Sequence, residues 1–192
     1  KYEPWDVVYV EKNFVFVIAD KYPYSGIIDL VVRTSDGKVK PMEHKTTSSI
    51  WHFDEQFDPN QQIAGYIMGL QSLVDNASDE AIINAILVPK RKALAISEKD
   101  FERFPNISRS PAQLEEFVSD AVDTIEKMQQ DFDRGYFRKN TVSCHQYGGC
   151  PYRTICKSEP GFDRQLKFNS YYTIEKWDPL HRDDAKPPEA PK

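Results

Sequence analysis

The sequence predicts an α/β (α+β) fold in which a mixed central β-sheet is flanked by helices. Residues 13–20 (NFVFVIAD) and 26–34 (GIIDLVVRT) are rich in β-branched and aromatic side chains, which favour strands. Residues 81–88 (AIINAILV) form a short apolar run that is typical of a buried strand. Two amphipathic helices are expected to begin near residues 58 and 110. Strands that alternate with helices in this way build a layered sheet.

The first strands are expected to form a three-stranded meander. Asp36 and Gly37 mark a hairpin turn, after which a third strand would run to about Thr46. Further along the chain, the basic turn at 90–92 (KRK) is followed by residues 94–97, which are expected to pair with the apolar strand before them.

The first helix has a clear start signal. Asp58 can cap the free N–H groups, and Pro59 fits the first helical position, where its missing donor does no harm. The buried stripe of this helix is expected to consist of residues at offsets of 4, 3 and 4, namely Ile63, Ile67, Leu70 and Val74.

The second helix is expected to begin with a capping box, because Gln113 follows Ser110-Pro111 at the required spacing, and to end near Gly135. Its apolar face would consist of Leu114, Phe117, Val118, Ala121, Ile125 and Met128. We predict a core over residues 1–140, a cysteine-containing segment packed on it over residues 141–182, and a polar tail over residues 183–192.

The chain is acidic overall, with 25 Lys and Arg against 30 Asp and Glu, and a formal charge of -5 over 192 residues. It lacks the positive charge of many nucleic-acid-binding proteins, although a local basic patch is enough to contact phosphates. There is no apolar run of roughly 20 residues and no signal segment, so we expect a cytoplasmic protein without a membrane partner. The chain begins at Lys1 rather than at a methionine, which is compatible with an upstream segment.

A candidate site lies on the second and third strands. Glu43 and Lys45 are two residues apart, so their side chains share one face of the sheet, with His44 on the other. Asp29 stands among apolar strand residues, where a charge needs a reason to be present. Two carboxylates beside one ammonium favour Mg²⁺ or Mn²⁺ and the hydrolysis of a phosphodiester, in which Lys45 would orient the nucleophile or stabilise developing charge. The alternative is that all three are ordinary surface charges of a sheet.

Whether Asp29 joins Glu43 depends on the register of the hairpin. A two-residue loop at Asp36-Gly37 would place Asp29 opposite His44, on the wrong face. A three-residue loop that includes Ser35 would place Asp29 opposite Glu43, and a bulge near Pro41 would also change the parity. We expect the three-residue loop or the bulge.

The first helix carries a second polar pair. Gln62 and Tyr66 are four residues apart and therefore neighbours on one face, offset from the apolar stripe. This pair would hold a nucleic-acid backbone or a metal-bound water. The alternative is that Gln62 lies at the surface and Tyr66 packs in the core.

Three motifs follow one another in the chain: Gly26-Ile27-Ile28-Asp29, Glu43-His44-Lys45-Thr46-Thr47 and Gln62-Ile63-Ala64-Gly65-Tyr66. Together they resemble the PD-(D/E)XK nuclease superfamily, and most of all its RecB-like branch, which adds a Q-x-x-x-Y helix and includes many phage and CRISPR-associated nucleases. The resemblance implies a restriction-endonuclease-like nuclease core.

The resemblance also implies roles for single residues. Asp29 and Glu43 would be metal ligands, and the backbone carbonyl of His44 would add a third oxygen. Lys45 would be the catalytic lysine, with Gln62 and Tyr66 as its supporting pair. The family usually has a further acidic or histidine residue on a helix before the first strand. Glu11, at the expected start of a strand, is a poor candidate for it.

All three cysteines, Cys144, Cys150 and Cys156, fall within thirteen residues. An odd count in an intracellular chain disfavours disulfides, so a metal or a cluster is expected. Several nucleases of the RecB-like branch hold a [4Fe–4S] cluster through one upstream cysteine and three after the core, and CHQYGGCPYRTIC resembles those three. The resemblance implies a structural cluster whose fourth ligand lies upstream of Lys1 or is His145. Zinc, or free or partly oxidised thiols, are the alternatives.

The expected function is that of a metal-dependent DNA nuclease, with an exonuclease favoured, acting on single strands or duplex ends in phage or prokaryotic replication, recombination or defence. Replication or recombination proteins would be further partners. Residues 90–92, Arg103 and Arg109 are candidate phosphate contacts, with a solvated turn as the alternative. The alternatives are a catalytically impaired module of the same fold that binds nucleic acid or a partner, and an iron–sulfur redox protein. No motif of an ATPase, a zinc protease or a serine hydrolase occurs.

Overall fold

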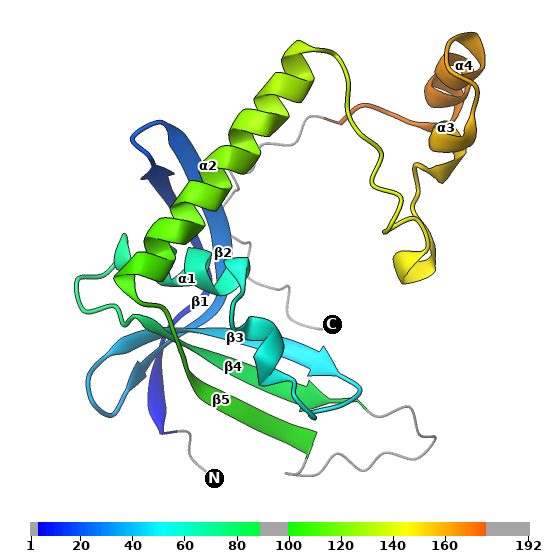
Figure 1. Cartoon of the computed structure of the whole chain (residues 1–192). Coiled ribbons are helices and arrows are strands. Elements are labelled where there is room, and N and C mark those ends of the chain that lie inside the picture. The colour runs from blue at the N-terminus through cyan, green and yellow to red at the C-terminus, as the bar shows by residue number, and fades with distance from the viewer. Residues whose placement is uncertain (1–3, 89–99, 176–192) are drawn as a thin grey trace, which may run out of the picture. The chain divides into compact units, whose positions relative to one another are not determined.

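The computed structural model describes residues 4–88 and 100–175 and has the predicted fold class. One five-stranded sheet has the order β1-β2-β3-β4-β5 and is mixed, because β3 and β4 are parallel and the other neighbours antiparallel (Figure 1). The strands are β1 (Trp5–Ile18), β2 (Tyr22–Thr34), β3 (Val39–Thr47), β4 (Glu80–Leu87) and β5 (Phe101–Ser108). The helices are η1 (Asp54–Phe57), α1 (Gln61–Gln71), α2 (Pro111–Asp133), η3 (Gln146–Gly148), α3 (Arg153–Lys157) and α4 (Phe162–Tyr171).

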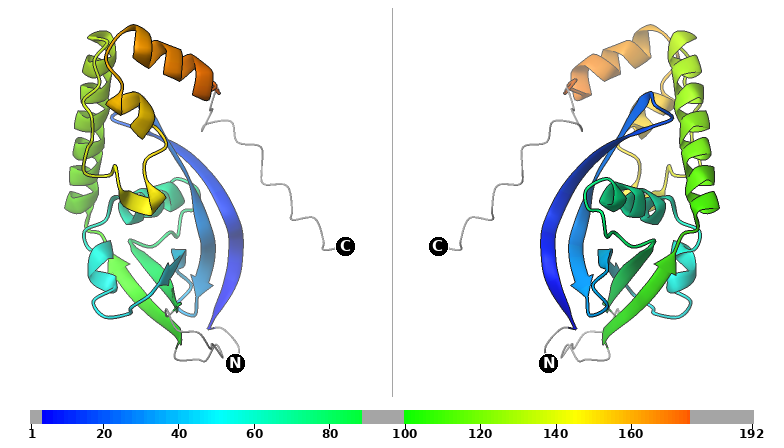
Figure 2. Two further views of the ribbon diagram at one scale, coloured as in Figure 1. Left: turned by 90° about the vertical axis from the view of Figure 1, so that its right-hand side faces the viewer. Right: turned by 90° about the vertical axis from the view of Figure 1, so that its left-hand side faces the viewer.

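The first two strands form a long curved hairpin (Figure 2). β1 begins at Trp5, eight residues before the predicted start, so Glu11 lies inside the strand rather than at its beginning. The early part of β1 was missed because charged residues interrupt its apolar ones, and many of its side chains are exposed. β3 pairs with β2 only from Leu30 to Arg33, so the other end of the hairpin extends beyond the rest of the sheet.

The turn between β2 and β3 has the three-residue form that brings Asp29 opposite Glu43. Thr34 N–H donates to the Lys38 carbonyl at 3.0 Å, and Gly37 has a φ of 82°, which glycine tolerates without strain. The pairing is continuous through Val31 opposite Pro41 and Leu30 opposite Met42. The recorded pairs end there, and one further step in the same register corresponds to Asp29 opposite Glu43 without a bulge at Pro41.

Helix α1 begins two residues later than predicted. Asn60, rather than Asp58, caps it: the Asn60 side chain accepts the N–H groups of Gln62 at 2.9 Å and Ile63 at 3.3 Å. The Asp58 cap was wrong because the Asp58 carboxylate instead pairs with the Arg109 guanidinium at 3.1 Å. Pro59 therefore precedes the helix.

The buried stripe of α1 is largely as predicted. Ile63, Ile67 and Leu70 have no exposed surface. Val74 lies beyond the end of the helix at Gln71 and is only partly buried. The first helix therefore buries three of the four predicted positions in the core.

The apolar strand β4 occupies the predicted central position, whereas its described antiparallel neighbour β5 was missed. The sequence of β5, FERFPNIS, contains two adjacent charged residues and a proline, a composition that does not predict a strand. An edge strand tolerates proline because one side of it has no ladder partner. The predicted strand at 94–97 and the basic turn at 90–92 lie outside the described residues.

The capping box of α2 is confirmed. Ser110 N–H donates to the Gln113 side-chain oxygen at 2.8 Å, and Gln113 N–H donates to the Ser110 hydroxyl at 3.3 Å. Gly135 follows the helix end with a φ of 62°, as expected. Of the predicted apolar face, Phe117 is buried whereas Met128 is 63% exposed.

The chain divides into two compact units, one up to Asp123 and one from Thr124 to Asp178. The first contains the sheet, α1 and the start of α2. The second contains η3, α3 and α4, three short helices that the sequence did not predict. The predicted boundary at residue 140 stays a prediction, and the predicted tail at 183–192 lies outside the described residues. None of the described helices is both long and apolar enough for a membrane span.

Candidate active site

Glu43 and Lys45 form an ion pair on the face of the sheet that α1 covers. The Lys45 ammonium donates to Glu43 Oε1. The Glu43 side chain is 4% exposed and the Lys45 side chain 35% exposed. A carboxylate is thus held in the protein interior, while its cationic partner reaches the surface.

Asp29 is linked to the strand of this ion pair by a hydrogen bond to the backbone of β3. Its Oδ2 accepts the backbone N–H of His44 at 3.0 Å. This bond lies just beyond the last paired residues of β2 and β3, where a side chain satisfies the donor that a ladder partner would otherwise satisfy. Asp29 is therefore fixed beside the strand that carries Glu43.

Gln62 links α1 to both members of the ion pair. Its Oε1 accepts from the Lys45 ammonium at 3.2 Å, and its Nε2 donates to Glu43 Oε1 at 3.1 Å. The same Nε2 group donates to the Tyr66 hydroxyl oxygen at 3.0 Å. Sheet and helix thus share one connected polar network. Asp29 joins it through the backbone of β3.

Tyr66 is 8% exposed and lies at the inner end of this network. Burial raises the pKa of the Tyr66 hydroxyl far above its ordinary value of 10.0, and the negative charges of Glu43 and, to a smaller extent, Asp29 raise it further. Tyr66 therefore stays neutral at any physiological pH and acts as a hydrogen-bonding group rather than a base.

The His44 imidazole points to the opposite face of the sheet. Its Nδ1 lies 3.0 Å from the Asn84 amide nitrogen, and Asn84 Oδ1 accepts from Arg103 Nε at 3.2 Å. The Arg103 guanidinium in turn lies over the Trp5 ring, 4.3 Å from its centre. The His44 backbone N–H contacts Asp29, whereas the His44 ring contacts Asn84, so the ring is not directed at Asp29. The role of the His44 carbonyl as a ligand stays a prediction.

The chemistry of these residues fits a divalent cation. Glu43 Oε2 is buried and has no hydrogen-bond partner among the described residues. A buried carboxylate oxygen without a partner is costly, and it offers a hard ligand of the kind that Mg²⁺ and Mn²⁺ prefer. Asp29 and Glu43 against Lys45 also leave one excess negative charge. Within residues 4–88 and 100–175, no group of three or more His, Cys, Asp or Glu side chains could hold a metal, so main-chain oxygen or water would complete the shell.

Two glycines of α1, whose role was not predicted from the sequence, set the distance between α1 and the hairpin. A Cβ atom at Gly65 would lie 2.6 Å from the Tyr24 hydroxyl, and one at Gly69 would lie 2.6 Å from the Phe14 ring. Their absent side chains let α1 approach closely enough for Gln62 to reach Lys45. Two glycines four residues apart in an apolar helix were the signal available in the sequence.

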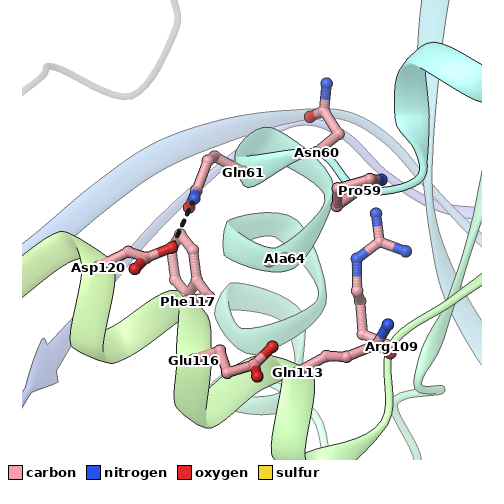
Figure 3. A pocket seen from close by; sticks show the side chains of 9 residues that line it. All are labelled: Pro59, Asn60, Gln61, Ala64, Arg109, Gln113, Glu116, Phe117 and Asp120. Atoms are coloured by element: carbon pink, nitrogen blue, oxygen red, sulfur yellow. Dashed lines mark hydrogen bonds between the residues drawn. The ribbon is translucent and has the colours of Figure 1, made fainter.

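Arg109 is not free to contact phosphate. It is 3% exposed, and its guanidinium donates to the carbonyls of Phe57 and Ser108 as well as pairing with Asp58. It lines a cavity of about 190 Å³ between α1 and the start of α2, and neither Asp29 nor Glu43 lines that cavity (Figure 3). Arg109 thus fastens the segment before α1 to the end of β5, which corrects its expected role. Arg103 is exposed, with the contacts given above.

The three cysteines lie in the second unit, around η3 and α3. All are free thiols; Cys144 and Cys150 are partly buried and Cys156 is exposed. Cys150 N–H donates to the Cys144 carbonyl at 3.1 Å, so two of them adjoin through the backbone. As they lie, the three cysteine side chains do not form a group that could hold a metal ion, and no such group occurs among the described residues. The arrangement therefore does not fit a cluster without a rearrangement of the loop.

Comparison with known proteins adds a family match. The family model of the PD-(D/E)XK nuclease superfamily matches residues 1–157. Among solved structures, the crystal structure of SSO0001 matches with a TM-score of 0.39 and 16% sequence identity, over 60% of this chain and 50% of that chain. The chain thus spans about half the length of that protein. No curated protein matches the sequence.

Proposed function

The chain belongs to the PD-(D/E)XK nuclease superfamily, and we propose that it is a metal-dependent deoxyribonuclease with Asp29, Glu43 and Lys45 at its active site. The observation that carries this proposal concerns the two oxygens of the Glu43 carboxylate. Lys45 and Gln62 hold Oε1, whereas the buried Oε2 has no protein partner among the described residues. The Asp29 carboxylate is held beside the same strand by the His44 N–H. The mixed sheet flanked by helices is consistent with a restriction-endonuclease-like core.

Asp29 and Glu43 would hold Mg²⁺ or Mn²⁺, with the His44 carbonyl as a third oxygen. When bound, such an ion lowers the pKa of a water and polarises a phosphoryl oxygen. Glu43 suits this role because the sheet and α1 hold its side chain in one place. Asp29 suits it because the His44 N–H occupies Oδ2 and fixes the orientation of the carboxylate.

Lys45 would stabilise the negative charge that develops on the scissile phosphate or orient the attacking water. Its ammonium is partly exposed and so accessible to a substrate, yet Glu43 and Gln62 hold it in position. Gln62 would keep Lys45 and Glu43 at a fixed separation, and the neutral Tyr66 hydroxyl would support Gln62 from behind. Such preorganised groups stabilise a transition state because they need no rearrangement during the reaction.

Hydrolysis of end-labelled DNA in Mg²⁺ or Mn²⁺ tests this proposal. We expect Lys45→Ala and Asp29→Ala to lower the cleavage rate by about a hundredfold or more. Lys38→Ala and Asp75→Ala are matched controls, because both residues are exposed and lie away from the site. Metal-dependent cleavage that survives both site substitutions would refute the assignment.

A non-catalytic module of the same fold is the second candidate. The observation that favours it is that Lys45 and Asp29 already have protein partners, so the network is largely satisfied without a ligand. The same assay separates the two, because such a module would bind DNA without cutting it at any metal concentration.

The finer proposals concern the biological setting. The Gln62 and Tyr66 pair supports placement in the RecB-like branch, and with it an exonuclease acting on single strands or duplex ends in phage or prokaryotic replication, recombination or defence. Digestion of circular against linear DNA tests the exonuclease proposal, since an exonuclease leaves closed circles intact. A cytoplasmic location and replication or recombination partners belong to this same proposal.

A [4Fe–4S] cluster, with zinc as the alternative, is proposed for Cys144, Cys150 and Cys156. The support is that no hydrophobic residue of the described second unit is buried, and such a small unit commonly needs a metal or a crosslink to be stable. The thiols would have to come together on metal binding. Iron, sulfide and zinc analysis of anaerobically purified protein distinguishes these alternatives from free thiols. An iron–sulfur redox protein would further require a reversible spectral change on reduction.

A further inference from the structure

One stretch of the second unit, residues 138–167, has a charge opposite to that of the chain as a whole. Residues 138–167 carry six Lys or Arg (Arg138, Lys139, Arg153, Lys157, Arg164 and Lys167) against two acidic residues, Glu159 and Asp163, which gives +4 in a chain of net charge -5. The Arg153 and Lys157 side chains are exposed and have no partner among the described residues. A basic segment in an acidic protein is suited to bind a polyanion.

Aromatic rings accompany these charges. Tyr172 stacks on Tyr152 with ring centres 5.7 Å apart and on Phe168 with ring centres 6.0 Å apart, and the planes differ by 18° and 14°. The Tyr172 hydroxyl donates to the Pro151 carbonyl at 2.6 Å, which locks this stack against the start of α3. The neighbouring Tyr171 is 72% exposed.

An open pocket of about 500 Å³ lies beside the stack, between α3 and α4. Pro151, Thr154, Lys167, Tyr171 and Tyr172 line it. Lys167 pairs with Asp163 at 2.8 Å, and both side chains are more than a third exposed. Because an exposed ion pair of this kind contributes little stability, Lys167 can contact a phosphate instead. The pocket therefore combines tyrosine side chains, a hydroxyl and a cation in a space large enough for one nucleotide.

We propose that this pocket binds an unpaired nucleotide of a single-stranded nucleic acid, with the base on Tyr171 and the phosphate at Lys167. Stacking of bases on aromatic rings with a cation at the backbone is the common mode of sequence-independent single-strand binding. Arg153 and Lys157 would contact the neighbouring phosphates. The inference rests on the proposed function only for the choice of nucleic acid as the polyanion.

Fluorescence anisotropy with a labelled oligothymidylate tests the proposal on the full chain, with the metal chelated so that no cleavage occurs. We expect Tyr171→Ala to weaken binding by about tenfold or more. Lys167→Gln should lower the slope of log affinity against log salt by about 0.7, the value for one contact to a single strand. Phe162→Ala is the matched control, because Phe162 is an exposed aromatic of α4 that does not line the pocket.

Equal affinities of wild type, Tyr171→Ala and Lys167→Gln would overturn the proposal, as would equal binding of a duplex of the same length. Glu43→Gln separates it from the proposed function. If that variant binds the oligonucleotide like wild type but does not cut it, both stand. If wild type binds through Tyr171 but never cuts, the proposed function fails and this site stands. If cutting depends on Glu43 but binding ignores Tyr171, only this site fails.

Discussion

The two units of the chain differ in whether their charged groups are buried or exposed. In the first, the Glu43 carboxylate is buried, and its partners come from the sheet and from α1. In the second, cations and aromatic rings are exposed, and every buried hydrophobic residue among those described lies at or before Phe117. A buried site gains geometric control from its packed surroundings, whereas an exposed basic surface can adapt to a flexible ligand.

Under the two proposals, this difference would suit the first unit to bond cleavage and the second to binding of a single strand. Bond cleavage needs groups held within a fraction of an ångström, which a core that fully buries Ile63 and Ile67 of α1 can provide. Binding of a single-stranded nucleic acid depends more on contact area and positive charge than on a rigid binding site. The division predicts that substitutions of buried residues in the first unit lower stability and activity together, while those of exposed residues around the pocket between α3 and α4 lower binding alone.

The largest stability effect is expected in the core. Ile67→Ala should lower the free energy of unfolding by about 2–5 kcal/mol, because the fully buried side chain leaves a cavity in the layer between α1 and the sheet. Ile174→Ala should change it by less than about 0.5 kcal/mol, since Ile174 is 86% exposed. Urea denaturation measures both. Equal losses of stability for the two variants would contradict the difference in burial between the two units.

A smaller effect is expected at the close approach of α1 to the hairpin. Gly65→Ala should destabilise the protein by about 1 kcal/mol, because the cost of overpacking against Tyr24 exceeds the gain in helix propensity. Tyr24→Phe removes the hydroxyl oxygen that the new methyl group would meet, so the double variant should regain part of the loss. A double-mutant cycle of the two substitutions, measured by denaturant melts, gives their coupling energy. If the two changes in free energy of unfolding simply add, the contact with the Tyr24 hydroxyl does not cause the loss.

The smallest effect is a dependence of stability on alkaline pH. Because the pKa of Tyr66 is raised in the folded protein, the unfolded chain ionises first and binds fewer protons above pH 10.0, the ordinary pKa. Stability contributed by Tyr66 is therefore complete below that pH and is lost as the pH rises above it. Between about pH 9 and about pH 11, the free energy of unfolding from denaturant melts should fall less for Tyr66→Phe than for wild type. Parallel slopes would argue against a buried neutral hydroxyl.

Much of the sheet and the first helix could be predicted because their signals are local. Apolar runs predict β2 and β4, and the Asp36-Gly37 turn predicts β3. Ser110 with Gln113 predicts the start of α2. The site was then inferred from strand parity, and the three-residue turn brought Asp29 and Glu43 together. The residue types alone could not decide this, because two-residue and three-residue turns fit the same letters.

The errors have a common physical origin in tertiary contacts. Asp58 has the chemistry of a helix cap, but the buried Arg109 competes for its carboxylate, and Asn60 caps instead. Arg109 was predicted to contact phosphate because the neighbouring sequence gives no sign that the carbonyls of Phe57 and Ser108 accept its guanidinium hydrogens. The glycines of α1 were overlooked because their role appears only when the hairpin packs on the helix.

The central claim is that Glu43, with Asp29, holds the metal that drives cleavage. Mn²⁺ binding by calorimetry and Mn²⁺-dependent hydrolysis of DNA, measured on wild type, Glu43→Gln and the exposed control Glu115→Gln, test it together. We predict that Glu43→Gln weakens Mn²⁺ binding by about tenfold or more and cleavage by about a hundredfold or more, with an unchanged circular dichroism spectrum, while Glu115→Gln behaves like wild type. Folded Glu43→Gln protein that binds Mn²⁺ and cuts DNA at the wild-type rate would contradict the account.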